Sequence, residues 1–160
     1  LGPLTNPAGA THQVIGVPRP DLVEKIAAVL ARLGADHALV VHGEDGFDAI
    51  SIAGRSIVAE LLDGAVRTYT VTPEDTGLRR HDISTIIGDT PEHNAAELRE
   101  VLAGRPGSLR DFALLNAAAA LVAWGTAPDL KSGVQQAAQS VDSGAAMAKL
   151  QAFIAATNEV

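Results

Sequence analysis

Residues 36–52 read Asp-His-Ala-Leu-Val-Val-His-Gly-Glu-Asp-Gly-Phe-Asp-Ala-Ile-Ser-Ile, an aliphatic run that passes into an acidic loop with glycines. The aliphatic run, residues 38–41, is rich in valine and bounded by polar residues and glycine, which is typical of a strand buried on both faces. Such a strand indicates a parallel sheet. Ligands of open α/β sheets bind in loops at the carboxyl ends of strands, so the following loop is the first candidate for a functional site.

Three carboxylates, Glu44, Asp45 and Asp48, occur in this loop beside Gly43 and Gly46. Carboxylates on a backbone that glycine allows to approach closely can hold a hard divalent cation, which in turn binds phosphate oxygens. The same composition is also ordinary turn chemistry, which is the commoner case. The loop therefore has two interpretations, a magnesium and phosphate site or a structural turn.

Composition and charge exclude several classes of protein. A chain of 160 residues has the size of one domain, and without cysteine it has no disulfide scaffold, thiolate zinc site or cysteine nucleophile. The formal net charge of −7 argues against a nucleic-acid partner, so a polyphosphate substrate would need a metal or local cations. No apolar stretch is long enough for a membrane span and no signal peptide is recognisable, so we expect a cytoplasmic protein.

The first part of the chain predicts a strand, a helix and a second strand. Residues 12–17 alternate weakly, and Asp21 with Glu24 forms a plausible capping box for a helix that ends at Gly34. Five apolar residues fall on one side of that helix and are expected to face a sheet: Leu22, Ile26, Val29, Leu30 and Leu33. A crossover of this kind is right-handed in nearly all known cases.

A hairpin is expected next. Residues 56–62 and 65–71 read as strands joined by Asp63-Gly64, a strong hairpin signal, and residues 50–52 are interpreted as a further short strand. Residues 72–80 are predicted to be loop, and residues 84–87 one helical turn.

From Thr90 onward the pattern predicts helices only. Thr90 and Pro91 begin the first, whose inner face carries Ala95, Leu98 and Leu102, and residues 112–124 are so apolar that we expect burial on nearly all sides. Asp129 begins a third helix, and Ser143-Gly144 precedes the last. The predicted fold class is α/β: a mixed, mostly parallel sheet with a β-hairpin, packed by helices.

Isolated polar residues have mainly structural interpretations. Asn116, within the apolar helix, is expected to bond backbone groups rather than a ligand. His42 is interpreted as the polar end of a buried strand, and no His-x-x-x-His pair or nucleophile elbow occurs.

Four motifs together resemble the anthranilate phosphoribosyltransferase family in order and spacing, over residues 2 to about 155. They are Gly2-Pro3-Leu4-Thr5-Asn6-Pro7, His42-Gly-Glu-Asp-Gly-Phe-Asp48, Thr72-Pro-Glu-Asp-Thr-Gly77 and Leu115-Asn-Ala-Ala118. The resemblance implies a tryptophan-pathway reaction assisted by Mg²⁺, in which the amine of anthranilate displaces pyrophosphate from 5-phosphoribosyl diphosphate (PRPP). It also implies a small helical domain joined to a larger α/β domain of the nucleoside phosphorylase and phosphoribosyltransferase type, in a homodimer.

The resemblance assigns roles to individual residues. Gly2 and Pro3 match the segment that lines the anthranilate channel, and Asp48 matches the first carboxylate of the family's magnesium-binding Asp-Glu pair. The second position of that pair is Ala49, which has no ligand atom. Glu44 or Asp45 are the candidates to substitute for the missing carboxylate.

The resemblance also implies that residues 1–160 form a partial α/β domain. The family's helical domain, its glycine-rich phosphate loop and the arginine that meets anthranilate precede the segment matched here. We therefore expect the 160 residues alone to be inactive, and to aggregate through the surfaces that the missing part would cover.

The sequence is also compatible with two alternatives. The first is a non-catalytic or altered-ligand homologue, a binding module whose metal site is degraded at Ala49. The second is a nucleoside phosphorylase of related architecture, which would use phosphate without the acidic pair. An intact phosphate loop and arginine upstream would favour the transferase over the binding module.

Overall fold

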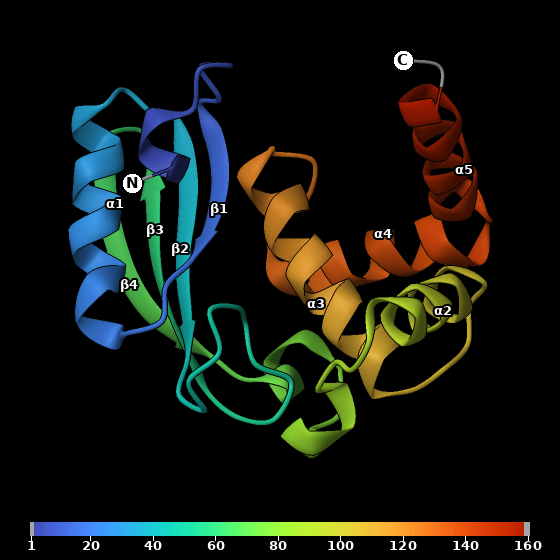
Figure 1. Ribbon diagram of the computed structural model, residues 1–160. Helices are drawn as coiled ribbons and strands as arrows, with labels where there is room; N and C mark the ends of the chain where they lie inside the picture. The colour runs from blue at the N-terminus through green and yellow to red at the C-terminus, as the bar shows by residue number, and fades with distance from the viewer. Residues whose placement is uncertain (1, 159–160) are drawn as a thin grey trace.

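The computed structural model describes residues 2–158, which form a four-stranded sheet between two helical layers (Figure 1). The strands are β1 (His12–Gly16), β2 (His37–Gly43), β3 (Ser56–Leu62) and β4 (Ala65–Val71). The α-helices are α1 (Val23–Arg32), α2 (Pro91–Leu102), α3 (Ser108–Ala123), α4 (Leu130–Asp142) and α5 (Ala145–Asn158). Short 3-10 helices are η1 (Gly2–Thr5), η2 (Pro20–Leu22), η3 (Pro73–Thr76) and η4 (Ile83–Ile86).

The sheet is mixed and has the order β1-β2-β3-β4. β1 and β2 are parallel, as a strand–helix–strand unit predicts, whereas β2 pairs with β3 and β3 with β4 in antiparallel fashion. The mixed α/β sheet with a hairpin is confirmed, but in this part of the protein antiparallel pairs outnumber the parallel one. The reason is that the segment between β2 and β3 turns back without a crossover helix.

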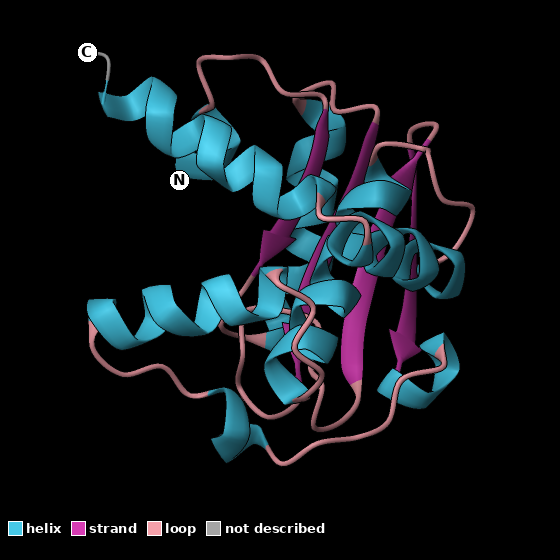
Figure 2. Ribbon diagram, turned by 90° about the vertical axis from the view of Figure 1, so that its right-hand side faces the viewer, coloured by secondary structure: helices cyan, strands magenta, loops and turns pink. Residues whose placement is uncertain are grey.

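The two faces of the sheet carry separate cores. α1 covers one face, where Val23, Ala27 and Leu30 pack against Ala38 and Val40. α3 covers the other face and α4 packs on α3, and in Figure 2, seen from the side of this helical layer, the strands lie behind helices. Because side chains alternate along a strand, β2 contributes to both cores, and all seven of its residues are buried as predicted.

The hairpin forms over the predicted residues. Asp63 and Gly64 both have positive φ, 50° and 76°, which is the backbone of a type I′ turn. The short strand expected at residues 50–52 is absent. Ile50 and Ile52 are fully buried there as loop residues, so their apolar pattern reflects burial and not pairing.

Two other helix predictions are corrected. Asp21 does not cap α1, because its carboxylate pairs with Arg19 and Lys25 and the helix begins without a side-chain cap. On the face that we expected to be apolar, Val29 and Leu33 are exposed. Thr90 and Asp129, in contrast, cap α2 and α4 through the backbone amides of His93 and Ser132.

The helical layer is less buried than the sequence suggests. On α2 Val101 is buried, whereas Leu98 of the predicted inner face is exposed. α3 buries one side only, Trp124 just after it is 68% exposed, and Phe153 on α5 is 65% exposed. None of the helices within residues 2–158 combines the length and apolar character needed to cross a membrane.

Candidate functional site at the carboxyl ends of the strands

The carboxyl ends of β1, β2 and β4 lie at the same end of the sheet, because all three strands run in the same direction. The ends of β1 and β2 are tied together. The Val17 amide donates to the Val41 carbonyl at 2.9 Å, and buried His42 donates from Nδ1 to the Val17 carbonyl at 2.9 Å. His42 is therefore the polar end of a buried strand, as predicted.

The loop after β2, residues 44–55, uses two of its three carboxylates internally. Glu44 pairs with Arg55 at 2.8 Å. Asp45 accepts a hydrogen bond from the hydroxyl of Ser51 and another from the Phe47 amide. Both carboxylates therefore have partners within the loop, and an ion at Asp48 would have to compete with Arg55 or Ser51 for them.

Ser51 organises the second half of this loop. It is fully buried, and its hydroxyl accepts hydrogen bonds from the amides of Ala53 and Gly54 at 2.9 and 3.1 Å while donating to Asp45. The Ser51 amide itself donates to the hydroxyl of Ser56. Ser51 thus has a structural role, which agrees with the absence of a nucleophile motif.

Asp48 is different from the other two acids. Its side chain is exposed and has no hydrogen-bond or ion-pair partner among residues 2–158. Its backbone lies directly against the end of β1, since a Cβ atom built on Gly16 would lie 1.7 Å from the Asp48 carbonyl oxygen. The loop therefore holds the backbone of Asp48 tightly and leaves its carboxylate available at the sheet edge.

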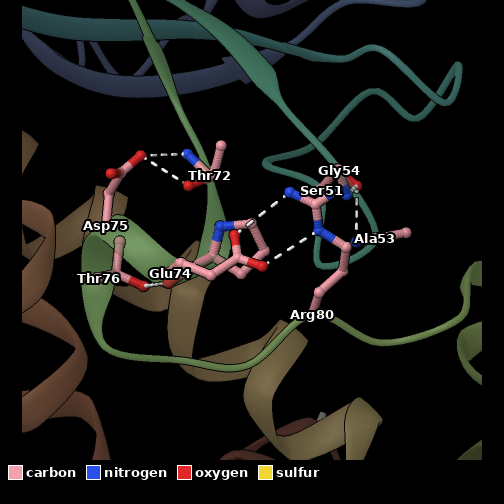
Figure 3. A network of polar contacts seen from close by, with 9 residues as sticks. Ser51, Ala53, Gly54, Thr72, Glu74, Asp75, Thr76 and Arg80 are labelled. Atoms are coloured by element: carbon pink, nitrogen blue, oxygen red, sulfur yellow. Dashed lines mark hydrogen bonds and ion pairs between the residues drawn. The ribbon is translucent and has the colours of Figure 1, made fainter.

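The loop after β4 abuts the loop after β2, where the His81 amide donates to the Ile52 carbonyl at 3.0 Å. Figure 3 shows its acids turned to their own loop, Asp75 toward Thr72 and Glu74 toward Arg80. The Thr72 hydroxyl and amide lower the pKa of the Asp75 carboxyl. The Glu74 backbone amide and the Arg80 guanidinium lower that of Glu74.

A magnesium site is only partly built from these residues. Within residues 2–158 no three His, Asp or Glu side chains gather closely enough to hold a metal ion. Mg²⁺ in phosphate-transfer sites is commonly held by one or two carboxylates and by substrate phosphates. Asp48 fits that minimum, so an ion here would depend on phosphate oxygens and water for the rest of its coordination.

Gly2 and Pro3 lie elsewhere. Pro3 lines a pocket together with Thr11, Gly34 and Ala35. Thr11 directly precedes β1, and Gly34 and Ala35 come shortly before β2. The amino ends of these strands are opposite the edge that carries Asp48. The described chain therefore does not bring Gly2 and Pro3 together with Asp48.

Sequence reasoning missed the importance of Gly16. No role was predicted for Gly16 from the sequence, although a glycine at the end of a half-buried strand indicates that another part of the backbone approaches closely. Asn116 was expected to bond backbone groups, and it does so on the loop after β2.

Residues 1–147 match the family described as "Glycosyl transferase family, a/b domain". An anthranilate phosphoribosyltransferase from Moorella thermoacetica is 54% identical over 155 residues, which are 97% of this chain and 46% of that protein. The enzyme of that name from Rhodopseudomonas palustris is 52% identical over 158 residues, 99% of this chain and 47% of that protein.

Solved structures agree. The crystal structure of anthranilate phosphoribosyltransferase from Thermus thermophilus superposes with a TM-score of 0.88 at 42% identity, covering 96% of this chain and 45% of that chain. The Saccharomyces cerevisiae enzyme in complex with PRPP and Mg has a TM-score of 0.89 at 27% identity, covering 100% of this chain and 46% of that one. This chain thus spans just under half the length of the relatives it matches.

Proposed function

The chain belongs to the glycosyl transferase family through its a/b domain, and from that premise we propose that it is part of an anthranilate phosphoribosyltransferase. The proposed reaction transfers the phosphoribosyl group of PRPP to anthranilate and releases pyrophosphate in tryptophan biosynthesis. The observation that carries the proposal is the unpaired Asp48 carboxylate at the carboxyl ends of the strands, in a chain 54% identical to a protein of that name.

Asp48 is the proposed protein ligand of Mg²⁺ on the diphosphate. When bound, the ion would neutralise charge on the departing pyrophosphate. The exposed side chain of Asp48, on a backbone fixed against Gly16, supports this role. Gly2 and Pro3 are proposed to line the anthranilate channel on the strength of their motif alone.

In the full-length protein, catalysis would rest on positioning and electrostatic stabilisation, without a covalent nucleophile. We also propose a homodimer in the cytoplasm, with anthranilate and PRPP as its ligands and without nucleic acid or membrane as partners. The motifs and the acidic, cysteine-free composition support these proposals.

A second candidate is a homologue that keeps the fold and has lost catalysis. Ala49 favours it, because the internal bonds of Glu44 and Asp45 leave Asp48 without a second carboxylate. The near 50% identity to proteins named as the enzyme favours the first candidate.

The test is an assay of the full-length protein with anthranilate, PRPP and Mg²⁺. We expect anthranilate fluorescence to fall as pyrophosphate is released in equal amount, and Asp48→Asn to reduce the rate at least about a hundredfold, given that changes merely next to metal ligands cost ten- to hundredfold. Binding of PRPP without any consumption of anthranilate would instead support the non-catalytic homologue.

A further inference from the structure

We propose that Asn116 is a positioning residue for the metal-binding carboxylate, because its amide fixes the loop segment that ends two residues after Asp48. The inference rests on the proposed function, in which Asp48 ligates Mg²⁺. It adds a residue that touches neither substrate nor metal and acts through the loop backbone.

The side chain of Asn116 holds both polar groups of one loop residue. The Ile50 amide donates to Asn116 Oδ1 at 2.9 Å, and Asn116 Nδ2 donates to the Ile50 carbonyl at 3.0 Å. Nδ2 also donates to the Phe112 carbonyl on the preceding turn of α3, at 3.0 Å, and this bond fixes the orientation of the amide. We refer to these bonds to Ile50 as the amide clamp.

Among residues 2–158 the amide clamp supplies the hydrogen-bond partners of both backbone polar groups of Ile50. Ile50 is fully buried and lies outside any strand, so water does not reach its amide and carbonyl. A buried backbone group without a partner is costly, so the loop would move to regain one if the clamp were removed. Asn116 therefore determines where Ile50 lies.

A movement of Ile50 would be transmitted to Asp48. Only Ala49 separates the two residues, and the Asp48 backbone is confined on its other side by Gly16. Just before Asp48, the Phe47 ring packs edge-on against Phe112 of α3, with 6.3 Å between ring centroids. Asp48 is thus held between the end of β1 and two contacts to α3.

The position of the Asp48 carboxylate matters more in this chain than it would if a second carboxylate lay beside it. Since Ala49 has no ligand atom and Glu44 and Asp45 are bonded within the loop, the direction of a single carboxylate decides how well the loop can hold an ion. Groups that orient metal ligands typically change metal affinity ten- to hundredfold.

The chain provides a matched control in Asn94. This asparagine on α2 makes the same pair of bonds to one residue, accepting from the Asp89 amide at 2.9 Å and donating to the Asp89 carbonyl at 3.2 Å. It makes no hydrogen bond to the loop after β2. Substituting it removes a clamp of the same geometry at an exposed place elsewhere in the chain.

The experiment measures PRPP affinity by calorimetry with and without Mg²⁺, on the full-length protein and four variants. These are Asn116→Leu, Asn116→Asp, Asn94→Leu and Asp48→Asn, each checked for folding by circular dichroism. The magnesium-dependent gain in affinity is the readout, since a merely structural defect would weaken binding equally with and without the ion. Hydrogen exchange at the Ile50 amide reports on the clamp itself.

We expect Asn116→Leu to lose protection at Ile50 and about tenfold of the magnesium-dependent gain, with affinity in the absence of Mg²⁺ within about twofold of the native value. Asn116→Asp, which keeps the acceptor for the Ile50 amide, should lose less, and it decides the question if the leucine variant does not fold. Asn94→Leu should keep the full gain.

The outcomes separate the two proposals. A gain that Asp48→Asn removes and both Asn116 variants keep would overturn the role of Asn116 and leave the proposed function intact. A native protein without any magnesium-dependent gain, or one whose gain survives Asp48→Asn, would overturn Asp48 as the metal ligand and with it the role of the clamp.

Discussion

Residues 44–55 after β2 and residues 72–80 after β4 are neighbouring loops that each contain an adjacent Glu-Asp pair, and the first also contains Asp48. After β4, Glu74 and Asp75 are both engaged within the loop, by Arg80 and Thr72. After β2, Glu44 and Asp45 are engaged in the same way, but Asp48 has no partner among residues 2–158. In the loop after β4 both carboxylates bond within the loop, whereas the loop after β2 has one further carboxylate that is available to a ligand.

Besides the additional carboxylate of Asp48, the two loops differ in where the partners of their acids lie. In the loop after β4 the partner of Asp75 is three residues away, so the capping box is visible in the sequence Thr72-Pro-Glu-Asp75. In the loop after β2 the partners of Asp45 and Glu44 lie at Ser51 and Arg55, beyond any local motif. Counting carboxylates therefore overestimates the ligands available to a metal.

Of the substitutions that test the difference between the two loops, Gly16→Ala is expected to have the largest effect on stability and on PRPP binding. The new Cβ would overlap the Asp48 backbone, so the loop after β2 must move, at a cost of about 3 kcal/mol, the upper end for overpacking. Urea unfolding measures the stability, and calorimetry should show the loss of magnesium-dependent PRPP binding. Gly54→Ala, in the same loop with open space around it, is the control and should change neither. Equal effects of both variants would contradict the close approach.

A smaller effect is expected from Ser51→Ala. It removes the hydroxyl that serves Asp45 and the amides of Ala53 and Gly54, and buried groups left without a partner cost about 1–3 kcal/mol. We expect about 2 kcal/mol of lost stability in urea unfolding. Ser140→Ala, an exposed site on α4, should leave stability nearly unchanged. A loss below about 0.5 kcal/mol, the lower limit for one hydrogen bond, would show that the loop does not depend on Ser51.

The smallest effect is expected in the loop after β4, where Thr72→Val should change the pKa of Asp75. Hydrogen bonds from the Thr72 hydroxyl and amide lower the pKa of Asp75 in the folded protein, so this carboxylate stabilises the fold above its unfolded pKa. That contribution is lost as the pH falls through the folded pKa. Thr72→Val removes the hydroxyl and should raise the pKa of Asp75 toward its usual 3.8, as measured by a carbon NMR titration.

Asp82 is the internal control for that titration, because Ser84 and not Thr72 lowers its pKa. Its titration should be the same in the native protein and in Thr72→Val. An unchanged Asp75 in the variant would show that the hydroxyl does not hold this carboxylate.

Much of the fold could be predicted from local signals. Turn chemistry at Asp63-Gly64 gives the hairpin, and the caps Thr90 and Asp129 give two helix starts, because these signals act within a few residues. The short strand at residues 50–52 was predicted wrongly because an apolar run reports burial, and here burial comes from packing under α3 and not from strand pairing.

The site was less accessible to sequence reasoning, for a physical reason. The contacts between Gly16 and Asp48 and between Asn116 and Ile50 join residues 32 and 66 positions apart, and only the folded chain brings them together. The motif identified Asp48 as the candidate metal ligand and showed that Ala49 has no ligand atom. It could not show that Glu44 and Asp45 are already engaged.

The most direct test of the account is calorimetry of PRPP binding to the full-length protein with Mg²⁺, comparing the native sequence with Asp48→Ala and Ala49→Glu. We predict that the native protein binds, that Asp48→Ala abolishes the magnesium-dependent binding, and that Ala49→Glu strengthens it about tenfold, equal to about 1.4 kcal/mol. Binding seen only in Ala49→Glu, or binding that survives in Asp48→Ala, would contradict the claim that Asp48 alone provides the carboxylate of this site.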